Sequence, residues 1–173
     1  ELLKLNPNYS KKKVFVYKKF ENFKITKKKI EKKIIIFLEE KNVPTSFFFK
    51  IAKEISNKKD FILAYKFRPN NSQNLSILNY CNRNKIKTFH KDSFEKLASR
   101  QNILAIIATN STALINASYF QVFPICIESR FSLSYYFKEK IVFPLKMNTN
   151  ILQQLRNIFN NKKKLNNIKK KLK

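Results

Sequence analysis

An uncharged stretch from Gln101 to Ile127 constrains the fold of this chain more than any other part of its sequence. It contains two short apolar runs rich in β-branched residues, at 103–108 and 122–127. Such runs, bounded by polar residues, are typical of strands that are buried on both faces of a sheet. Between the runs, a helix start can be capped by Asn110, Ser111 or Thr112. Four apolar residues then share one helix face: Ala113, Leu114, Ala117 and Phe120. The stretch therefore predicts a parallel strand–helix–strand unit.

A membrane span is the alternative interpretation of this uncharged stretch. Its middle, however, holds seven polar residues that would lie unpaired in hydrocarbon, and each apolar run is too short to cross a bilayer alone. We therefore expect no transmembrane segment. The polar residues are Thr109, Asn110, Ser111, Thr112, Asn116, Ser118 and Gln121.

After a predicted helix at 46–56, strands and helices are expected to alternate from Phe61 onward. The strands are expected at 61–65, 86–89, 103–108, 122–127 and 141–143, the last closed by Pro144. The helices are expected at 46–56, 75–84, 94–98, 113–120 and 151–159, the last capped by Asn148 or Thr149. This alternation predicts a single α/β, Rossmann-like domain at 1–161, with a mostly parallel sheet and helices on both faces.

The two ends of the chain carry different patterns. An arm at 1–10 and a β-hairpin of strands 13–18 and 23–25 are expected in the first 26 residues. A helix at 27–41 should follow, with Ile30, Ile34, Phe37 and Leu38 as its apolar stripe. The basic tail at 162–173 has only a weak helical stripe of Leu165, Ile168 and Leu172. We expect this tail to be disordered, or ordered only by RNA or a neighbouring protein.

The formal net charge of +26 limits the partners that the chain can have. A domain with that charge repels itself unless an anionic partner neutralises it. Nucleic acid is the leading candidate, and an anionic membrane surface is the alternative. Because no DNA-reading motif is present, RNA is favoured over DNA.

The sequence contains no glycine, and it is rich in Lys, Asn, Ile and Phe. We interpret this composition as the mark of an AT-rich genome, which is typical of genes encoded in organelles. Phosphate-loop and dinucleotide-binding motifs are excluded because both need glycine. Turns with positive φ should then use Asn or Asp, and Asn-Asn pairs occur at 70–71, 160–161 and 166–167.

Lysine clusters are the candidate RNA-binding residues. Lysine is a point charge without base specificity, which suits recognition of the RNA backbone. Arg68 follows a predicted buried strand, so it should lie at the carboxyl edge of the sheet, where ligands usually bind in open α/β folds. Tyr17, Phe20 and Phe23 either stack on bases or belong to the core. The candidates are Lys11, Lys12, Lys13, Lys18, Lys19, Lys27, Lys28, Lys29, Arg68, Lys162, Lys163, Lys164, Lys169, Lys170 and Lys171.

The sequence indicates no active site. The single histidine, His90, lies two residues from Asp92 but has no nucleophile with a supporting motif. Cys81 and Cys126 are expected to be buried thiols, since their spacing matches neither a redox nor a metal motif. We therefore expect no catalytic residue, metal, cofactor or small-molecule substrate.

Three segments resemble the family of the universal second protein of the small ribosomal subunit, whose eukaryotic member is laminin-receptor-like. The first is Asn6-Pro7, Val14-Phe15-Val16-Tyr17 and Asn22-Phe23-Lys24-Ile25. The second is Ala117-Ser118-Tyr119 followed by Pro124-Ile125-Cys126-Ile127. The third is Ile141-Val142-Phe143-Pro144 with Asn148. Together they cover nearly the whole chain in order.

Two parts of the bacterial family members are missing from this sequence. Their glycine-rich stretch is absent, with 90–97 in its approximate place, and so is the helical hairpin that they insert next. A divergent mitochondrial ribosome would explain both losses, and we favour it over a plastid one. The resemblance implies a structural protein of the small subunit, near the messenger exit, with small-subunit rRNA and neighbouring ribosomal proteins as partners. The alternatives are a basic RNA-binding assembly factor and a peripheral membrane-surface protein.

Overall fold

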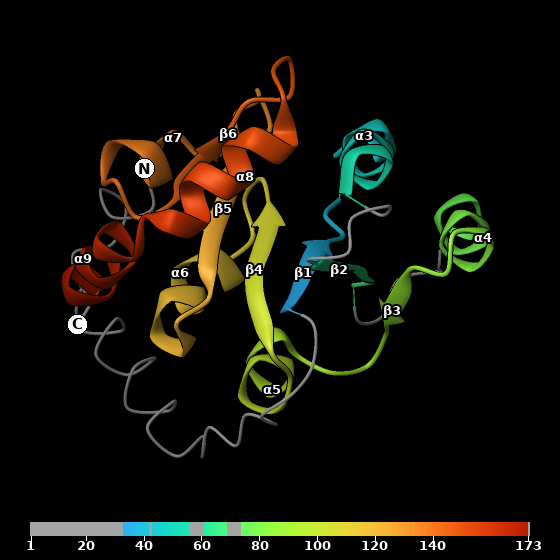
Figure 1. The fold of residues 1–173 in the computed structure, drawn as a ribbon, viewed down its shortest axis with the longest axis horizontal. Helices are drawn as coiled ribbons and strands as arrows, with labels where there is room; N and C mark the ends of the chain where they lie inside the picture. Colours follow the sequence, from blue (N-terminus) through green and yellow to red (C-terminus); the bar gives the residue numbers. More distant parts are fainter. Residues whose placement is uncertain (1–32, 42, 56–60, 69–73, 173) are drawn as a thin grey trace.

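A single parallel sheet lies at the centre of the molecule (Figure 1). The computed structural model describes residues 33–41, 43–55, 61–68 and 74–172 of the 173. Within these residues the strands run in the order β3-β2-β1-β4-β5-β6, which is Rossmann-like. The strands are β1 (Lys33–Leu38), β2 (Phe61–Lys66), β3 (Lys87–Phe89), β4 (Ile103–Ala108), β5 (Phe123–Ile127) and β6 (Phe143–Leu145). The predicted single α/β architecture with a parallel sheet is confirmed.

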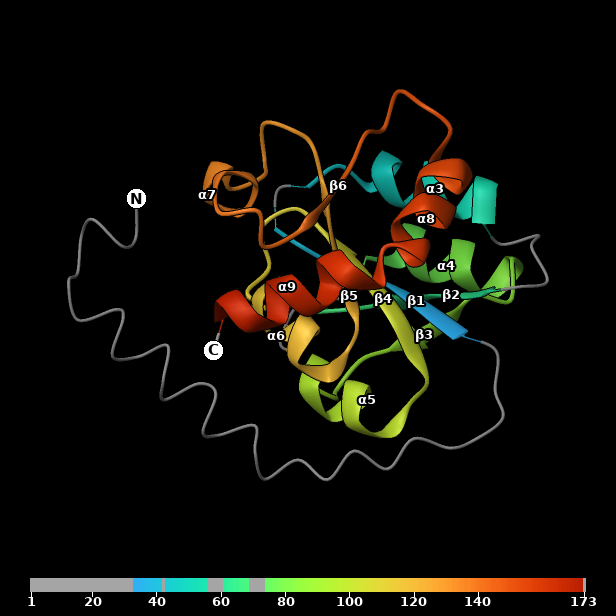
Figure 2. The same cartoon turned by 60° about the vertical axis from the view of Figure 1, so that its left-hand side comes forward.

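Helices cover both faces of this sheet, as predicted (Figure 2). On one face lie α3 (Thr45–Ile55), α4 (Leu75–Arg83) and α8 (Ile151–Asn160). On the other lie α5 (Phe94–Arg100), α6 (Ala113–Ala117) and the short 3-10 helix η1 (Ser118–Phe120). The remaining helices are α7 (Ser134–Lys138) and α9 (Lys162–Leu172). No helix among the described residues is long and apolar enough to cross a membrane.

The central strand–helix–strand unit forms as its sequence predicts. Strand β4 spans the first apolar run, and β5 begins one residue into the second. The four residues of the predicted helix face are all at most 8% exposed. Of the three candidate caps, Ser111 is the one whose Oγ accepts from the Ala113 amide, at 3.3 Å. Local periodicity and capping were therefore sufficient to define this unit.

The helix predicted at 27–41 is wrong where the structure describes it, because residues 33–38 form strand β1. The prediction grouped Ile34, Phe37 and Leu38 into one helical stripe. Ile35 and Ile36 fall outside that stripe, yet both are 0% exposed. A strand in the middle of a parallel sheet is buried on both faces, so its apolar residues are consecutive. The start of that predicted helix, like the arm and hairpin at 1–26, lies outside the described residues.

Three smaller predictions are also corrected. Pro144 lies inside β6 instead of closing a strand at 141–143, and β6 is an edge strand, where proline is tolerated. Helix α8 is capped by Asn150, whose Oδ1 accepts from the Gln153 amide at 2.8 Å, and not by Asn148 or Thr149. The sequence predicts a tail that is disordered, or ordered only by RNA or a neighbouring protein. It forms α9 instead, and its weak stripe of Leu165, Ile168 and Leu172 is buried in the domain.

The positive-φ positions do not use asparagine as predicted. In the described part of the chain they are Lys85, Gln121 and Lys140, with φ of 53°, 58° and 53°. Asn161, by contrast, has φ of −95°, and the pair at 166–167 lies within α9. The pair at 70–71 lies outside the described residues. A lysine or glutamine therefore adopts the left-handed conformation that glycine usually supplies.

Each of these three residues ends a helix in the same way. The residue that follows it donates its N–H to a carbonyl five positions back, which is the six-to-one bond of a Schellman motif. These bonds are Ile86 to Cys81 (2.9 Å), Val122 to Ala117 (3.0 Å) and Ile141 to Tyr136 (3.1 Å). The donor residue is β-branched and at most 7% exposed in every case. Burial of that side chain therefore accompanies each left-handed turn.

We predict that glycine at these positions stabilises the protein. A Cβ in the left-handed region costs about 1–2 kcal/mol, and the greater freedom of glycine in the unfolded chain offsets part of that gain. Lys85→Gly and Gln121→Gly should each raise the free energy of unfolding by about 0.5–1 kcal/mol. Lys85→Ala and Gln121→Ala are the matched controls, because they shorten the side chain but keep the Cβ. Urea denaturation would contradict the assignment if alanine and glycine gave equal gains.

Candidate nucleic-acid interface

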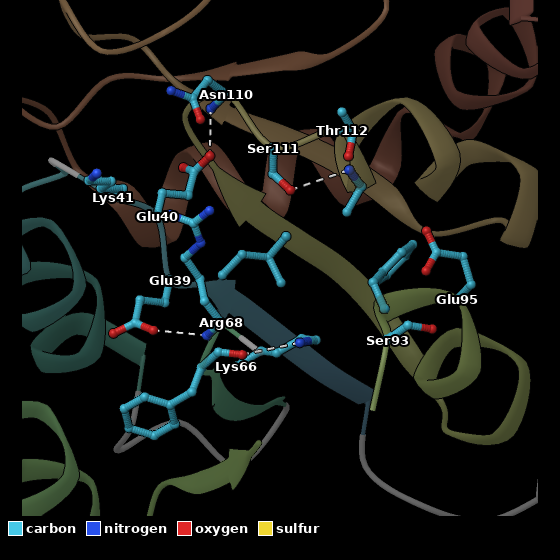
Figure 3. Close-up of a pocket in the computed structure, with 14 residues that line it drawn as sticks. Glu39, Glu40, Lys41, Lys66, Arg68, Ser93, Glu95, Asn110, Ser111 and Thr112 are labelled. Carbon is cyan, nitrogen blue, oxygen red and sulfur yellow. Dashed lines mark hydrogen bonds between the residues drawn. The ribbon is translucent and has the colours of Figure 1, made fainter. Parts of the chain in front are cut away.

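A crevice opens at the carboxyl ends of β1 and β4, where the strand order reverses. In open α/β sheets this reversal point is the usual ligand crevice, because the chain leaves the two strands toward opposite faces. The cavity has a volume of about 580 Å³. Figure 3 shows Glu39, Glu40 and Arg68 on one side of it and Ser93 and Glu95 on the other.

Glu40 joins the two halves of the sheet at this crevice. It follows β1, and its carboxylate accepts from the two residues that follow β4. Its Oε2 accepts from the amide and the hydroxyl of Thr109, the latter at 2.5 Å, and its Oε1 accepts from the Asn110 amide at 2.8 Å. Thr109 is fully buried. Glu40 thus occupies the backbone donors with which the β4 loop could otherwise hold an anion.

Arg68 lies at the carboxyl edge of the sheet, as predicted. It is exposed, and its backbone amide donates to Glu39 Oε2 at 2.8 Å. The charged residues lining the crevice balance, with Glu39, Glu40 and Glu95 against Lys41, Lys66 and Arg68. On a chain of net charge +26 this lining does not concentrate positive charge. It therefore lacks the charge excess expected of a polyanion-binding groove.

Lys66 is the one lysine that the described structure buries, with 7% of its surface exposed. Its Nζ donates to the Phe67 carbonyl at 3.2 Å. Burial lowers the Lys66 pKa, against the opposing effect of Glu95, Asp92 and Glu39. The sequence analysis did not identify Lys66, because this residue ends a strand whose pattern is otherwise that of a buried run.

His90 and Asp92 do not form a pair. The His90 ring stacks on Phe67 at 4.8 Å, and its Nε2 lies 3.1 Å from the Thr88 hydroxyl. Asp92 instead forms an ion pair with Lys96 at 2.7 Å, and this hydrogen bond lowers the Asp92 pKa. Across the described residues, no group of three His, Cys, Asp or Glu side chains is placed to hold a metal ion.

Both cysteines are buried thiols, as predicted. Cys81 lies in α4 and Cys126 in β5, and both are 0% exposed and free of disulfide bonds. Burial raises the pKa of Cys81 to about 11. Burial also raises the pKa of Cys126 to about 12, although a hydrogen bond with Ser132 opposes this shift.

Helix α9 is the most basic element that the structure describes. Six of its eleven residues are lysines and none is acidic. Its buried stripe holds it to the domain, where it packs against η1 beside α6 (Figures 1 and 2). The predicted RNA-binding lysines of the tail therefore lie on an ordered helix whose position relative to the sheet is defined.

The six lysines of α9 divide into two groups of three. Three contact the domain itself: Lys164 Nζ lies 4.6 Å above the Phe143 ring, Lys169 Nζ lies 5.6 Å above the Tyr119 ring, and Lys171 donates to the Glu139 carbonyl at 3.1 Å. Burial lowers the Lys164 pKa, and nearby Lys140 lowers it further. The other three, Lys162, Lys163 and Lys170, are exposed.

The structure brings only some of the predicted site residues together. Eight of them lie outside the described residues: Lys11, Lys12, Lys13, Lys18, Lys19, Lys27, Lys28 and Lys29. Arg68 and the α9 lysines do not share a surface, because β1 and β4 separate β2 from the β5 side of the sheet where η1 holds α9. Two exposed lysines that the sequence analysis missed, Lys138 and Lys140, lie at the end of α7 that meets α9.

No protein-family model matches this chain, and no curated protein is similar to it in sequence.

We predict that Glu40 is a major stabilising residue. Glu40→Ala leaves the amide and hydroxyl of buried Thr109 without their acceptor and should lower the free energy of unfolding by about 3 kcal/mol. Glu39→Ala is the matched control, because the donor that Glu39 has among the described residues is an exposed amide, and its effect should stay below about 1 kcal/mol. Urea denaturation of both variants measures the difference. Equal losses would show that Glu40 does not join the two halves of the sheet.

We predict that neither thiol reacts in the folded protein near pH 8. Raised pKa values keep both thiols protonated, and burial excludes the reagent. A thiol-reactive dye should label no cysteine in the native protein and both cysteines in guanidinium.

The two thiols should also make the stability of the protein depend on pH. Since each folded pKa lies above the ordinary value of 9.0 for a thiol, the stability that the protonated thiols contribute is complete below pH 9.0. It should fall as the pH rises toward 11 and 12. Fast labelling of the native protein would contradict the burial of the thiols.

Proposed function

We propose that this protein is a structural constituent of the small subunit of a mitochondrial ribosome, where it binds rRNA through lysine-rich surfaces. The observation that carries the proposal is helix α9 itself, which has six lysines, no carboxylate and an apolar stripe that is buried in the domain. Lysines on a fixed helix neutralise backbone phosphates and release their counterions.

The net charge points to the same partner. A charge of +26 on 173 residues destabilises a compact state through self-repulsion unless an anion neutralises it. An rRNA stem offers a dense array of phosphates to several lysine clusters at once. The clusters at 11–13, 18–19 and 27–29, which lie outside the described residues, would extend this contact.

The balanced crevice supports a structural role over a catalytic one. Its β4 amides are taken up by Glu40, and its charged residues cancel. What remains is a rigid sheet that displays charged helices. The resemblance to the second protein of the small ribosomal subunit supports the same role. Its second segment lies along α6, η1 and β5, beside the surface that holds α9.

We predict that the protein sediments with small ribosomal subunits. A tagged form expressed in the organelle should co-migrate with small-subunit rRNA in a density gradient and remain there in the mature particle. Dissociating the subunit with chelator and high salt should release it, because its contacts are electrostatic.

Three results would contradict this proposal. Protein that stays at the top of the gradient is not bound to the ribosome. Protein confined to immature particles is an assembly factor, and protein that floats with vesicles is a peripheral membrane protein.

Binding of the purified protein to small-subunit rRNA should weaken with salt by about 0.7–0.9 log units per phosphate contact for each decade of salt. Binding without such a dependence would overturn the lysine argument.

A further inference from the structure

The exposed face of α9 has an ordered pattern of residues. At 3.6 residues per turn, Lys163 and Lys170 point to the same side of the helix as Asn166 and Asn167, and Lys162 flanks this side. All five are exposed, while Leu165, Ile168 and Leu172 face the domain. The solvent side of α9 is thus a strip with lysines at both ends and two amides between them.

The dimensions of this strip suit a nucleic-acid groove. Lys163 and Lys170 are seven residues apart, which is about 10.5 Å along the helix axis. Each lysine side chain adds further reach, so the two ends can contact phosphates on opposite strands. The amides of Asn166 and Asn167 lie between them, and each can donate and accept a hydrogen bond.

Base stacking is disfavoured on this surface. Helix α9 contains no aromatic residue. The two rings beside it, Phe143 and Tyr119, are covered by Lys164 and Lys169. The helix also has no arginine, the residue that most often reads guanine edges in pairs of hydrogen bonds. A single strand read by stacking is therefore a poor fit, and a duplex contacted through its backbone is a good one.

We propose that α9 binds across the minor groove of a double-stranded RNA stem, with Lys162, Lys163 and Lys170 on phosphates and Asn166 and Asn167 on ribose 2′-hydroxyls. The minor groove of an RNA duplex is wide and shallow and displays its 2′-hydroxyls, so a helix can lie on it. Lys138 and Lys140 extend the basic surface beyond the end of α7. Lys164, Lys169 and Lys171 hold the helix in place and are not RNA contacts. This inference rests on the proposed function and names the form of RNA that α9 binds.

The test measures binding of the full chain to an RNA stem, a DNA duplex of the same sequence, and a single-stranded RNA of the same length. The variant Lys162→Gln, Lys163→Gln, Lys170→Gln should lower the salt dependence of RNA-stem binding by about two log units per decade of salt. Its matched control is Lys53→Gln, Lys85→Gln, Lys91→Gln, which removes the same charge from exposed positions outside α9. The control should leave most of the salt dependence intact.

The asparagines are tested separately from charge. The wild-type chain should prefer the RNA stem to the DNA duplex. The variant Asn166→Ala, Asn167→Ala should reduce that preference by about tenfold, without changing the salt dependence. Alanine favours the helix more than asparagine does, so loss of α9 cannot explain this result.

Different failures are distinguishable. If the triple lysine variant keeps the wild-type salt dependence, or the control loses as much, α9 is not the contact and the inference fails, while the ribosomal proposal stands on sedimentation. Equal binding to RNA and DNA, or no effect of the asparagine variant, overturns the minor-groove placement. A chain that binds none of the RNAs but binds vesicles of anionic phospholipid overturns the proposed function itself.

Discussion

A parallel sheet built without glycine is the constraint on which the rest of this structure depends. Every pair of neighbouring parallel strands needs a crossover, and roughly a third to a half of helices end in a left-handed residue. Lys85, Gln121 and Lys140 take that conformation at about 1–2 kcal/mol each. Burying the β-branched residue that follows stabilises by about 1.5–3 kcal/mol. Burial thus outweighs the backbone strain, and the helix ends remain compatible with the sheet.

The carboxyl edge of the sheet shows what happens to a Rossmann-like crevice when the phosphate-binding loop is missing. The crevice persists because it follows from the reversal of strand order. Its chemistry differs, since Glu40 accepts from the Thr109 and Asn110 amides and so turns the end of β4 into an internal cross-link. The fold therefore preserves the position of a ligand site without the donors that would bind a phosphate. This is why the fold alone says little about function here.

Local patterns predicted the elements in which one face is buried and missed those that depend on distant residues. The stripe of Phe48, Ile51, Ala52 and Ile55 gave α3 because those residues repeat at helical spacing and the rest of the segment does not. Strand β1 failed because a run buried on both faces contains every spacing, including the helical one. The link from Glu40 to Thr109 spans 69 residues and leaves no local trace, so the closed end of β4 could not be predicted. Arg68 was placed correctly because a strand end determines its position.

The same principle sorts the lysines of α9. From composition alone, all six lysines of α9 are predicted to bind RNA, because a run of lysines does not show which way each side chain points. The helical period and the buried stripe divide them, because Lys164 and Lys169 flank the stripe and reach rings of the domain, while Lys163 and Lys170 lie opposite the stripe and face solvent. Lys164 and Lys169 lie above the rings of Phe143 and Tyr119, so these two lysines pack against the domain. The packing of α9 on its own domain thus determines which of its lysines face solvent. Net charge alone does not determine this orientation.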